Sequence, residues 1–473
     1  MSAPIKLRDI TPPTPPGDDS FELYASRRHV YTRAFSGLFR NVRRAAGIVL
    51  LAVFFITAWL QHDGHQAVWW NLPERQFYIF GATFWPQDFI LLSGLLIVAA
   101  FGLFFITVYA GRVWCGYTCP QSLWTWMFMW CEQITEGDRQ QRIKLDNAPM
   151  SANKLLRKTA KHSLWILMGL ATGLTFVGYF APIRELSTTF FTGAASGWVY
   201  FWTAFVTVAT YGNAGWLREQ VCIYMCPYAR FQSVMFDKDT LIVSYDPGRG
   251  EARGPRRKDS ERAQAGLGDC IDCTLCVQVC PTGIDIRDGL QIECIGCAAC
   301  IDACDSIMDR MNYPRGLISY TTEHKLAGAP SRIVRPRLLA YAAVLLVLLG
   351  LLAQAFIQRP LDSLDVSKDR QMYREDAQGR IENVYSLKIM NKDQRMHRYH
   401  LGASGPEGLQ LQGKSELSVA AGEIASVIVT LSAPPKRLQP GAQNVVFTLD
   451  NLDRGTRVQS TSRFTAPSSL ARN

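Results

Sequence analysis

The chain has 473 residues, with 50 Lys and Arg against 40 Asp and Glu, and its net charge is +10. This length is too great for one compact core, so we expect several domains. The positive charge does not indicate a nucleic-acid partner, because basic segments alternate with long apolar runs in the way that anchoring to a lipid bilayer requires.

The N-terminal arm, residues 1–40, begins with a Pro-rich stretch that we predict to be disordered over residues 1–19. Arginines then precede the apolar run 45–60, which predicts a first transmembrane helix with a cytoplasmic N-terminus. A cleaved signal peptide is the alternative. Such a peptide would lie nearer the N-terminus and end in small residues, whereas this run ends in Trp59 and Leu60.

Four further apolar runs predict transmembrane helices, at residues 89–110, 163–180, 194–211 and 338–358. Residues 61–87 contain one basic residue and several aromatic ones, which predicts a periplasmic loop along the membrane interface. The connecting segments rich in Lys and Arg are expected on the cytoplasmic side of the membrane, and the C-terminal part on the outer, periplasmic side.

The cysteine-rich stretch between Cys270 and Cys304 contains two copies of the spacing C-x2-C-x2-C-x3-C, the spacing of bacterial two-cluster ferredoxins. In that arrangement the fourth cysteine of each half ligates the other cluster. We therefore predict two [4Fe–4S] clusters, one held by Cys270, Cys273, Cys276 and Cys304, the other by Cys280, Cys294, Cys297 and Cys300. Zinc sites and disulfides are the alternatives. Zinc does not need a repeated x3 step, and disulfides need an oxidising compartment.

A second pattern is an internal repeat: Cys115-x3-Cys119-Pro120 returns as Cys222-x3-Cys226-Pro227, each time after the second helix of a predicted hairpin. Repeats in membrane proteins often form a shared site, and a spacing of four places both thiols of a pair on one side of a helix. Four thiolates could surround a soft ion such as Cu(I), zinc or a further iron–sulfur cluster. The alternative is that they are apolar packing residues.

Other candidates are weaker. Cys131 has no repeat partner, and we interpret it as a packing residue. His62 and His65, and in the tail Met396, His397 and His400, contain copper-binding groups, but histidines in loops are more often solvated or capping groups.

The C-terminal tail alternates apolar and polar residues at 383–390, 425–432 and 444–450, which predicts a small β-sandwich. The predicted fold is an α-helical polytopic membrane protein with five transmembrane helices, a ferredoxin module and a C-terminal β-sandwich. The predicted domains are an arm at 1–40, a four-helix membrane domain at 41–245, the ferredoxin domain at 246–335, a fifth helix at 336–359 and a periplasmic domain at 360–473.

The sequence resembles the CcoG/FixG/RdxA family of cytochrome c oxidase accessory proteins. The resemblance rests on WCGYTCPQ at 114–121, on the long segment CIYMCPYARFQSVMFDKDTLIVSYDPGRGE at 222–251, on CPTGIDIRDGLQ at 280–291, on CIGCAACIDACD at 294–305 and on YPRGLI at 313–318. It implies a protein of the bacterial inner membrane with five spans, two [4Fe–4S] clusters and a periplasmic immunoglobulin-like tail. It also implies a role in maturing the cbb3-type cytochrome oxidase, by reducing Cu(II) to Cu(I) for the copper centre of that oxidase. It also implies that the cysteines of the paired C-x3-C-P motifs are the copper site.

The resulting hypothesis is a cupric reductase in which a cytosolic electron donor reduces the ferredoxin module, and one electron then passes to copper near Cys115, Cys119, Cys222 and Cys226. The oxidase itself or its copper chaperones would be the partners. Whether the protein forms a homodimer is left open by the sequence. Two other functions remain open as well: a quinol-linked membrane electron carrier, and a non-enzymatic scaffold for oxidase assembly.

Overall fold

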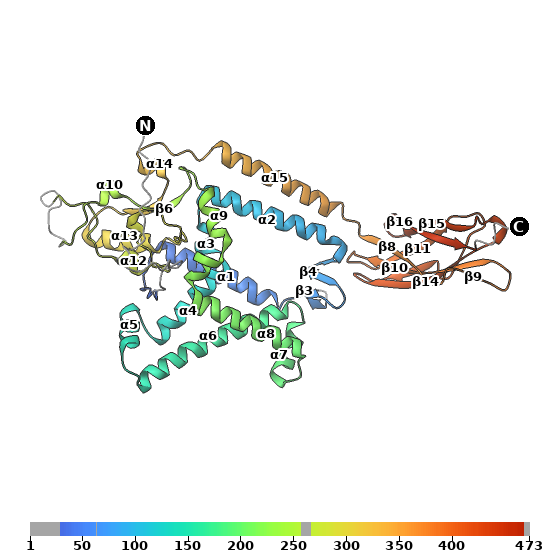
Figure 1. Ribbon diagram of the computed structural model, residues 1–473, viewed down its shortest axis with the longest axis horizontal. Coiled ribbons are helices and arrows are strands. Elements are labelled where there is room, and N and C mark those ends of the chain that lie inside the picture. Colours follow the sequence, from blue (N-terminus) through green and yellow to red (C-terminus); the bar gives the residue numbers. More distant parts are fainter. Residues whose placement is uncertain (1–28, 63, 257–265, 468–473) are drawn as a thin grey trace, which may run out of the picture.

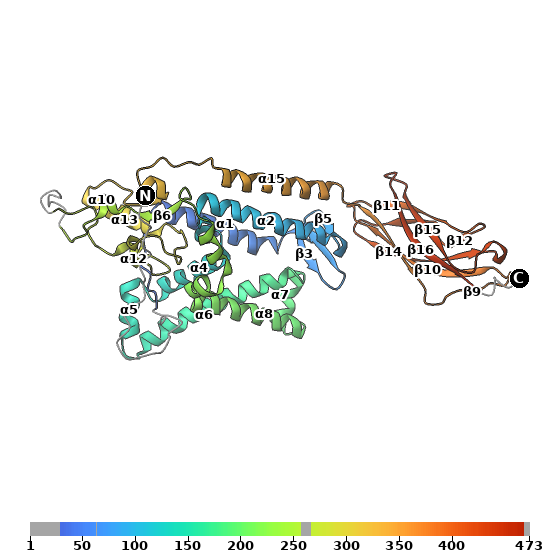
Figure 2. The same cartoon turned by 45° about the horizontal axis from the view of Figure 1, so that its top comes forward.

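The computed structural model describes residues 29–62, 64–256 and 266–467. A cysteine-rich module lies at one end, helices form the middle, and a β-sandwich lies at the other end (Figures 1 and 2). The stretch predicted to be disordered, residues 1–19, lies outside the described residues.

The middle part is helical, as the apolar runs predict. Its longer helices are α1 (Leu38–Thr57), α2 (Phe89–Ala110), α4 (Pro120–Thr135), α6 (Ala152–Gly178), α8 (Gly197–Thr210) and α15 (Pro336–Ile357). Shorter elements connect them: η1 (Pro86–Asp88), α3 (Val113–Tyr117), α5 (Arg139–Asn147), α7 (Ile183–Thr192), the π-helices η2 (Tyr211–Leu217) and η3 (Val221–Met225), and α9 (Pro227–Met235).

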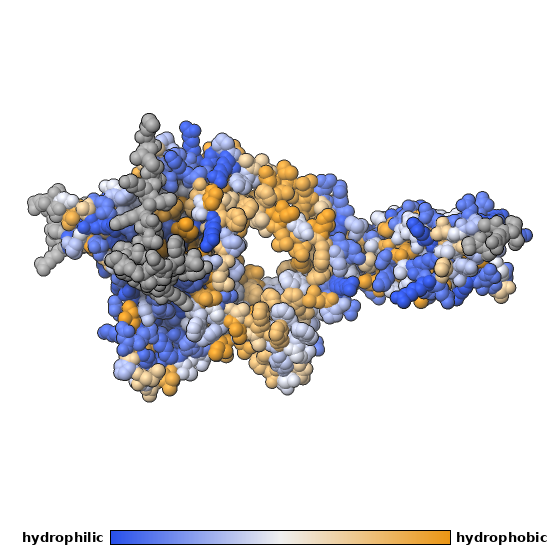
Figure 3. Space-filling model, in the orientation of Figure 1, coloured by the Kyte–Doolittle hydropathy of each residue, from blue (hydrophilic) through white to orange (hydrophobic). Residues whose placement is uncertain are grey.

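Each of the five predicted membrane spans corresponds to a helix, but the helices differ in character. Within the described residues, two segments are long and apolar enough to cross a membrane, Pro86–Ala110 and Pro336–Ile357. By contrast, α1 and α6 start earlier than predicted and take up basic residues, while α8 has 14 residues before the chain continues as η2. Apolar residues gather in the middle of the molecule, between two polar ends (Figure 3).

Small residues let pairs of helices approach closely. A Cβ added to Gly173 on α6 would lie 2.7 Å from the carbonyl oxygen of Thr203 on α8, and one on Gly169 would lie 3.1 Å from that of Thr207. Such contacts are typical of helix packing in membranes. On the other side of the helical part, Gly94 of α2 lies against Leu352 of α15.

The segment 61–87, predicted as an interfacial loop, instead contains regular structure. Short antiparallel strands form two small sheets from β1 (Gln61–His62), β2 (His65–Gln66), β3 (Val68–Asn71), β4 (Gln76–Ile79) and β5 (Ala82–Phe84). Trp69 and Tyr78 are cross-strand partners and stack with ring centroids 5.4 Å apart. Aromatic cross-strand pairs of this kind stabilise short strands, which explains why the segment is ordered.

The cysteine-rich module is built around a two-stranded antiparallel sheet of β6 (Ile242–Tyr245) and β7 (Ile318–Thr321). Its other elements are α10 (Pro247–Gly250), α12 (Leu275–Gln278), η4 (Ile286–Asp288), α13 (Ala299–Met311) and α14 (Glu323–Leu326). Val243, Ile301, Met308 and Ile318 form its buried core together with Cys270 and Cys276. The chain between β6 and β7 carries all eight predicted cluster ligands.

The C-terminal domain is a β-sandwich, as predicted. One sheet has the strand order β12-β14-β10-β8, with β9 paired to β10, and the other has the order β13-β11-β15-β16. The strands are β8 (Asp362–Lys368), β9 (Arg374–Glu375), β10 (Ile381–Asn391), β11 (His397–Ser404), β12 (Gln410–Gln412), β13 (Glu416–Val419), β14 (Ile424–Ala433), β15 (Gly441–Asn451) and β16 (Arg457–Ala466). Tyr385, Leu387, Tyr399 and Phe447 are fully buried between the sheets.

A buried ionic contact joins the helical part to the sandwich. Asp88, just before α2, binds Arg359 after α15 at 2.8 Å and Lys392 of the sandwich at 3.1 Å. All three side chains are almost completely buried. One carboxylate therefore connects the ends of α2 and α15 with the C-terminal domain.

Candidate metal centre

The structure groups the eight ferredoxin cysteines around two cavities. Cys304 lies with Cys270, Cys273 and Cys276 at the first, and Cys280 lies with Cys294, Cys297 and Cys300 at the second. Cys276 borders both. The fourth cysteine of each sequence half thus lies with the three cysteines of the other half, the arrangement that the spacing predicts.

The backbone of the two halves repeats the same local conformation. Asp272 and Gly296, and then Thr274 and Ala298, occupy equivalent positions and all have positive φ angles between 51° and 64°. This left-handed conformation is uncommon outside glycine, and its appearance at matching places shows that both loops wrap a cavity in the same way. In the second loop the Gly296 N–H donates to Cys294 Sγ at 3.4 Å, and such bonds to sulfur tune iron–sulfur clusters.

The surroundings of these thiols fit iron–sulfur ligation. Burial raises the pKa of Cys276, Cys294 and Cys304 to about 12. Buried thiols of this kind become thiolates when a metal compensates their charge. Among the described residues, no three His, Cys, Asp or Glu side chains are gathered closely enough to hold a single ion. Four sulfurs spread around a cavity suit a cube, whereas zinc draws its sulfurs to within about 2.3 Å of one point.

The paired C-x3-C-P motifs fold alike, although not as the predicted single helix face. Cys115 lies in the short helix α3, which ends at Tyr117, and Cys119 is the extended residue before Pro120 starts α4. In the second motif Cys222 lies in η3, and Cys226 is the extended residue before α9. Proline disfavours helical conformation in the residue before it, so each pair spans a break between two helices.

The structure brings the two motifs together. The four thiols interact electrostatically with one another, and burial together with the neighbouring thiols raises the pKa of Cys115 to about 11 and that of Cys222 to about 12. The Cys115 thiol donates to Gln232 Oε1 on α9 at 3.3 Å. A polar side chain that follows the second motif thus contacts the first thiol of the other motif.

A buried ion-pair network ties the two motifs to each other. Glu132 on α4 accepts from Arg218 at 2.6 Å and from Arg142 at 2.8 Å, and Lys161 lies 4.0 Å away. Arg218 lies between η2 and η3, four residues before Cys222, and α4 begins directly after Cys119. Our reading of the sequence missed this network. The available signal was an acidic residue, Glu132, inside an otherwise apolar aromatic stretch.

The C-x3-C-P motifs also lie directly on the second cluster loop. A Cβ added to Gly116 would lie 2.9 Å from Cys297 Cα, so only glycine allows α3 to pack this closely. Arg112 Nη1 donates to the carbonyl oxygen of Cys294 at 2.9 Å, and its Nη2 donates to that of Ala229 at 2.9 Å. Arg112 therefore connects the first C-x3-C-P motif, the second motif and the cysteine loop.

The remaining candidates do not join this site. Cys131 is buried beside Phe128 and Trp165, as a packing residue would be. His62 and His65 are cross-strand partners at the sandwich-facing end of α1. In the tail, His397 lies 2.9 Å from Asp393, and Met396 is exposed. Within the described part of the chain, neither His62 with His65 nor the tail residues Met396, His397 and His400 form a metal-binding cluster.

Comparisons with known proteins define the class first. Residues 217–323 match the family model of a 4Fe–4S dicluster domain, and residues 352–467 match the model described as an Ig-like fold at the C-terminus of FixG. The description of the second model proposes that FixG is an oxidoreductase. The chain is thus an iron–sulfur protein with an immunoglobulin-like C-terminal domain.

Curated relatives then give the family. The chain is 38% identical to the nitrogen fixation protein FixG of Rhizobium meliloti, over 78% of each chain. It is 39% identical to protein RdxA of Cereibacter sphaeroides, over 87% of this chain and 91% of that one, and 39% identical to protein RdxB of the same organism, over 84% and 86%. It belongs to the FixG/RdxA family. A crystal structure of a FixG-related protein from Vibrio parahaemolyticus matches at 27% identity, covering 22% of this chain and 96% of that one with a TM-score of 0.22.

Proposed function

We propose that this protein is a membrane-bound oxidoreductase that reduces Cu(II) to Cu(I) at the paired C-x3-C-P cysteines and supplies copper for maturation of a cbb3-type cytochrome oxidase. The observation that carries the proposal is the packing of α3 on the second cluster loop, with Gly116 against Cys297. This contact puts Cys115 next to the residues that would hold an electron-transfer cluster.

The proposal includes a five-helix topology with the ferredoxin module in the cytoplasm and the β-sandwich in the periplasm. The basic residues at the starts of α1, α6 and α15 are those expected on the cytoplasmic side. The cysteine module and the sandwich lie at opposite ends of the helical part, which fits compartments on the two sides of a bilayer (Figure 1). Basic side chains at a helix end can reach the interface, so the first turns of α1 and α6 are compatible with spanning.

The reaction needs one electron for each Cu(II), from a cytosolic one-electron donor. Held by the eight cysteines, the two [4Fe–4S] clusters would supply one-electron chemistry. The C-x3-C-P thiols would capture the copper ion, and thiolate ligands favour the soft product Cu(I), so binding assists reduction. The four thiols interact electrostatically with one another, so they could share one copper ion.

The test is a double substitution, Cys115→Ser with Cys222→Ser, in the full-length protein purified anaerobically. We expect Cu(II) reduction to be lost while the iron content and the visible cluster absorption stay unchanged, because the eight cluster ligands are untouched. Cys131→Ser is the matched control and should retain activity. Copper reduction by the double variant at the rate of the control would place the site elsewhere.

A second candidate function is electron transfer from quinol to another redox protein. The electron-carrier part of this candidate is supported by a 25% identity over 202 residues to the methylamine utilization ferredoxin-type protein MauN of Paracoccus denitrificans, which covers 42% of this chain and 56% of that one. Quinol as the electron donor is a further assumption of this candidate. Mixing the anaerobic protein separately with quinol and with Cu(II) distinguishes the two functions. A scaffold role predicts instead that variants without clusters still support oxidase assembly.

A further inference from the structure

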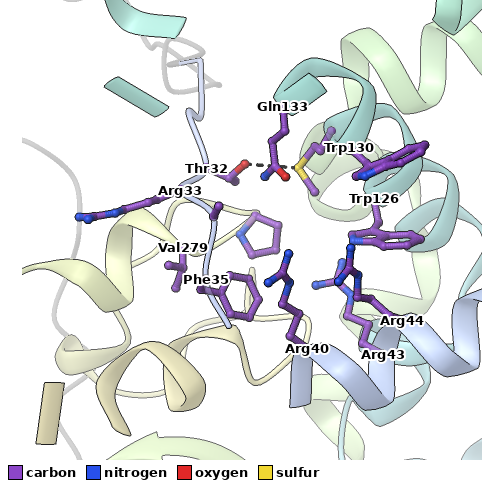
Figure 4. A pocket seen from close by; sticks show the side chains of 13 residues that line it. Thr32, Arg33, Phe35, Arg40, Arg43, Arg44, Trp126, Trp130, Gln133 and Val279 are labelled. Atoms are coloured by element: carbon purple, nitrogen blue, oxygen red, sulfur yellow. Dashed lines mark hydrogen bonds between the residues drawn. The ribbon is translucent and has the colours of Figure 1, made fainter. Parts of the chain in front are cut away.

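A basic cavity lies at the start of α1, away from the thiol site. Its lining includes Arg40, Arg43 and Arg44 of α1, Trp126 and Trp130 of α4, and Val279 and Pro281, which flank the cluster ligand Cys280. Figure 4 shows the three arginines rising from α1 towards Trp126, with Phe35 of the N-terminal segment nearby. We propose that this cavity binds the headgroup of one anionic phospholipid.

The charge of the cavity points to an anion. Asp302 lies near Arg40 and accepts from its backbone N–H, but among the carboxylates in the described residues none forms an ion pair with the guanidinium group of Arg43 or Arg44. The three arginines on α1 are half-buried, so their charges are not simply solvated. Guanidinium groups bind phosphate through charge-assisted, often paired hydrogen bonds, which makes phosphate the fitting anion.

The size and position of the cavity favour a lipid over a soluble nucleotide. The cavity has a volume of about 50 Å³, whereas pockets that enclose a drug-sized ligand have roughly 300–1,000 Å³. A cavity of this size fits a single phosphate group better than a whole nucleotide. Trp130 is half-exposed at the rim, and tryptophan is enriched at the level of lipid headgroups. Along α1, Val49, Val53 and Ile56 are exposed, as on a lipid-facing helix.

The lipid would hold together parts that the chain connects only distantly. Asp302 of the cluster module accepts from the backbone N–H of Phe39 at 3.2 Å and of Arg40 at 2.7 Å at the start of α1. A phosphate on the neighbouring arginines would bridge the same helix start to α4 and to the loop at Pro281. This inference rests on the membrane placement of α1 proposed above and is independent of copper reduction.

The experiment uses delipidated full-length protein in neutral detergent, with phosphatidylglycerol, phosphatidylcholine and inorganic phosphate as probes in native mass spectrometry and thermal melting. We expect one phosphatidylglycerol to bind and raise Tm, and phosphatidylcholine to bind at least about tenfold more weakly. Arg43→Gln with Arg44→Gln should weaken phosphatidylglycerol binding at least about tenfold. The matched control is Arg332→Gln with Arg337→Gln, which should bind like the unaltered protein; both arginines are exposed, Arg332 in the segment before α15 and Arg337 in its first turn.

An equal loss of phosphatidylglycerol affinity in the two double variants would overturn the proposal, because general charge attraction would then explain the binding. Stabilisation by inorganic phosphate equal to that by phosphatidylglycerol would also overturn it and indicate a soluble ligand. If the Arg43/Arg44 variant does not fold, a photoreactive phosphatidylglycerol should label peptides within 29–44 and 126–133 of the unaltered protein, and labelling elsewhere contradicts the site. Recovery of the protein in the soluble fraction without detergent would instead refute the membrane placement, while the copper assay tests the proposed reduction separately.

Discussion

The two sets of cysteines are built in different ways. The eight in the ferredoxin module come from one stretch of 35 residues, between positions 270 and 304, whose spacing already determines which thiols meet. The four C-x3-C-P cysteines come from two segments that meet through tertiary contacts, chiefly Glu132 with Arg218 and Cys115 with Gln232. The structure of the cluster module should therefore depend mainly on its own eight cysteines. The grouping of the C-x3-C-P cysteines should depend on the contacts between helices.

Removing a cluster ligand should have the largest effect. Cys276→Ala deletes the cysteine that borders both cavities. Because metal binding contributes directly to the folding of such modules, we expect loss of at least about half of the iron and of most of the module's stability. Iron analysis and thermal melting measure this. A variant with full iron content would show that Cys276 is not a ligand.

Breaking the ion-pair network should be the next largest effect. Glu132→Ala leaves Arg142 and Arg218 buried without their carboxylate, and removing one partner of a buried pair costs about 3–5 kcal/mol. Iron content should stay unchanged, because the cluster ligands are elsewhere. Thermal melting with iron analysis tests whether the C-x3-C-P segments loosen separately from the module. Loss of iron together with loss of thermal stability would contradict the view that the cluster module and the C-x3-C-P segments are held by different interactions.

The same residue predicts a pH dependence. Burial alone would raise the pKa of Glu132, but Arg218, Arg142 and Lys161 outweigh it and hold that pKa below its usual value of 4.5. The stability that Glu132 contributes is therefore fully present above about pH 4.5 and is lost as the pH falls through the lower folded-state pKa. Melting curves from pH 7 down to pH 3 should show this loss in the unaltered protein and a smaller one in Glu132→Gln.

Moving the C-x3-C-P cysteines away from the cluster loop should slow copper reduction without loss of iron. Gly116→Ala adds a Cβ 2.9 Å from Cys297 Cα, so α3 must move away from the cluster loop. Because a shift of about 1 Å can cost a hundredfold in rate, we expect copper reduction to fall by about tenfold or more with iron retained. Gly102→Ala on α2, where nothing lies within 4 Å, is the matched control. Unchanged rates in both variants would mean that this contact does not serve electron transfer.

The smallest effect is expected in the tail. Met396→Leu with His400→Gln changes an exposed and a half-exposed side chain on the sandwich, far along the chain from both sets of cysteines. Copper reduction and Tm should match those of the unaltered protein, since surface substitutions usually change stability by less than about 0.5 kcal/mol. A lower rate of copper reduction in this variant would assign the tail a role in copper handling.

Local patterns in the sequence predicted the local structure well. The span 89–110 coincides with α2, and the tail strands lie inside β10, β14 and β15, because apolar periodicity is a property of neighbouring residues. The grouping of the cluster cysteines likewise followed from spacing. The prediction of one helix face for each C-x3-C-P pair was wrong, because the effect of Pro120 and Pro227 on the preceding cysteine was not considered.

Contacts between distant segments were beyond what a single sequence offers. Neither the Glu132–Arg218 pair nor the bonds of Arg112 to Cys294 and Ala229 leave a pattern in the chain, since the partners are more than 80 residues apart. The strands between 61 and 84 were missed because each has no more than four residues. Such short strands depend on cross-strand aromatic packing, which periodicity does not reveal.

Rapid mixing of the anaerobically reduced protein with Cu(II) tests the central claim most directly, with cluster absorption and Cu(I) formation followed together. The account predicts that the unaltered protein forms one Cu(I) for each electron lost from the clusters, with matching rates. In Cys115→Ser with Cys222→Ser, the clusters should stay reduced and no Cu(I) should form. Oxidation of the clusters by Cu(II) at an unaltered rate in that variant would contradict the claim that electrons leave through the C-x3-C-P thiols.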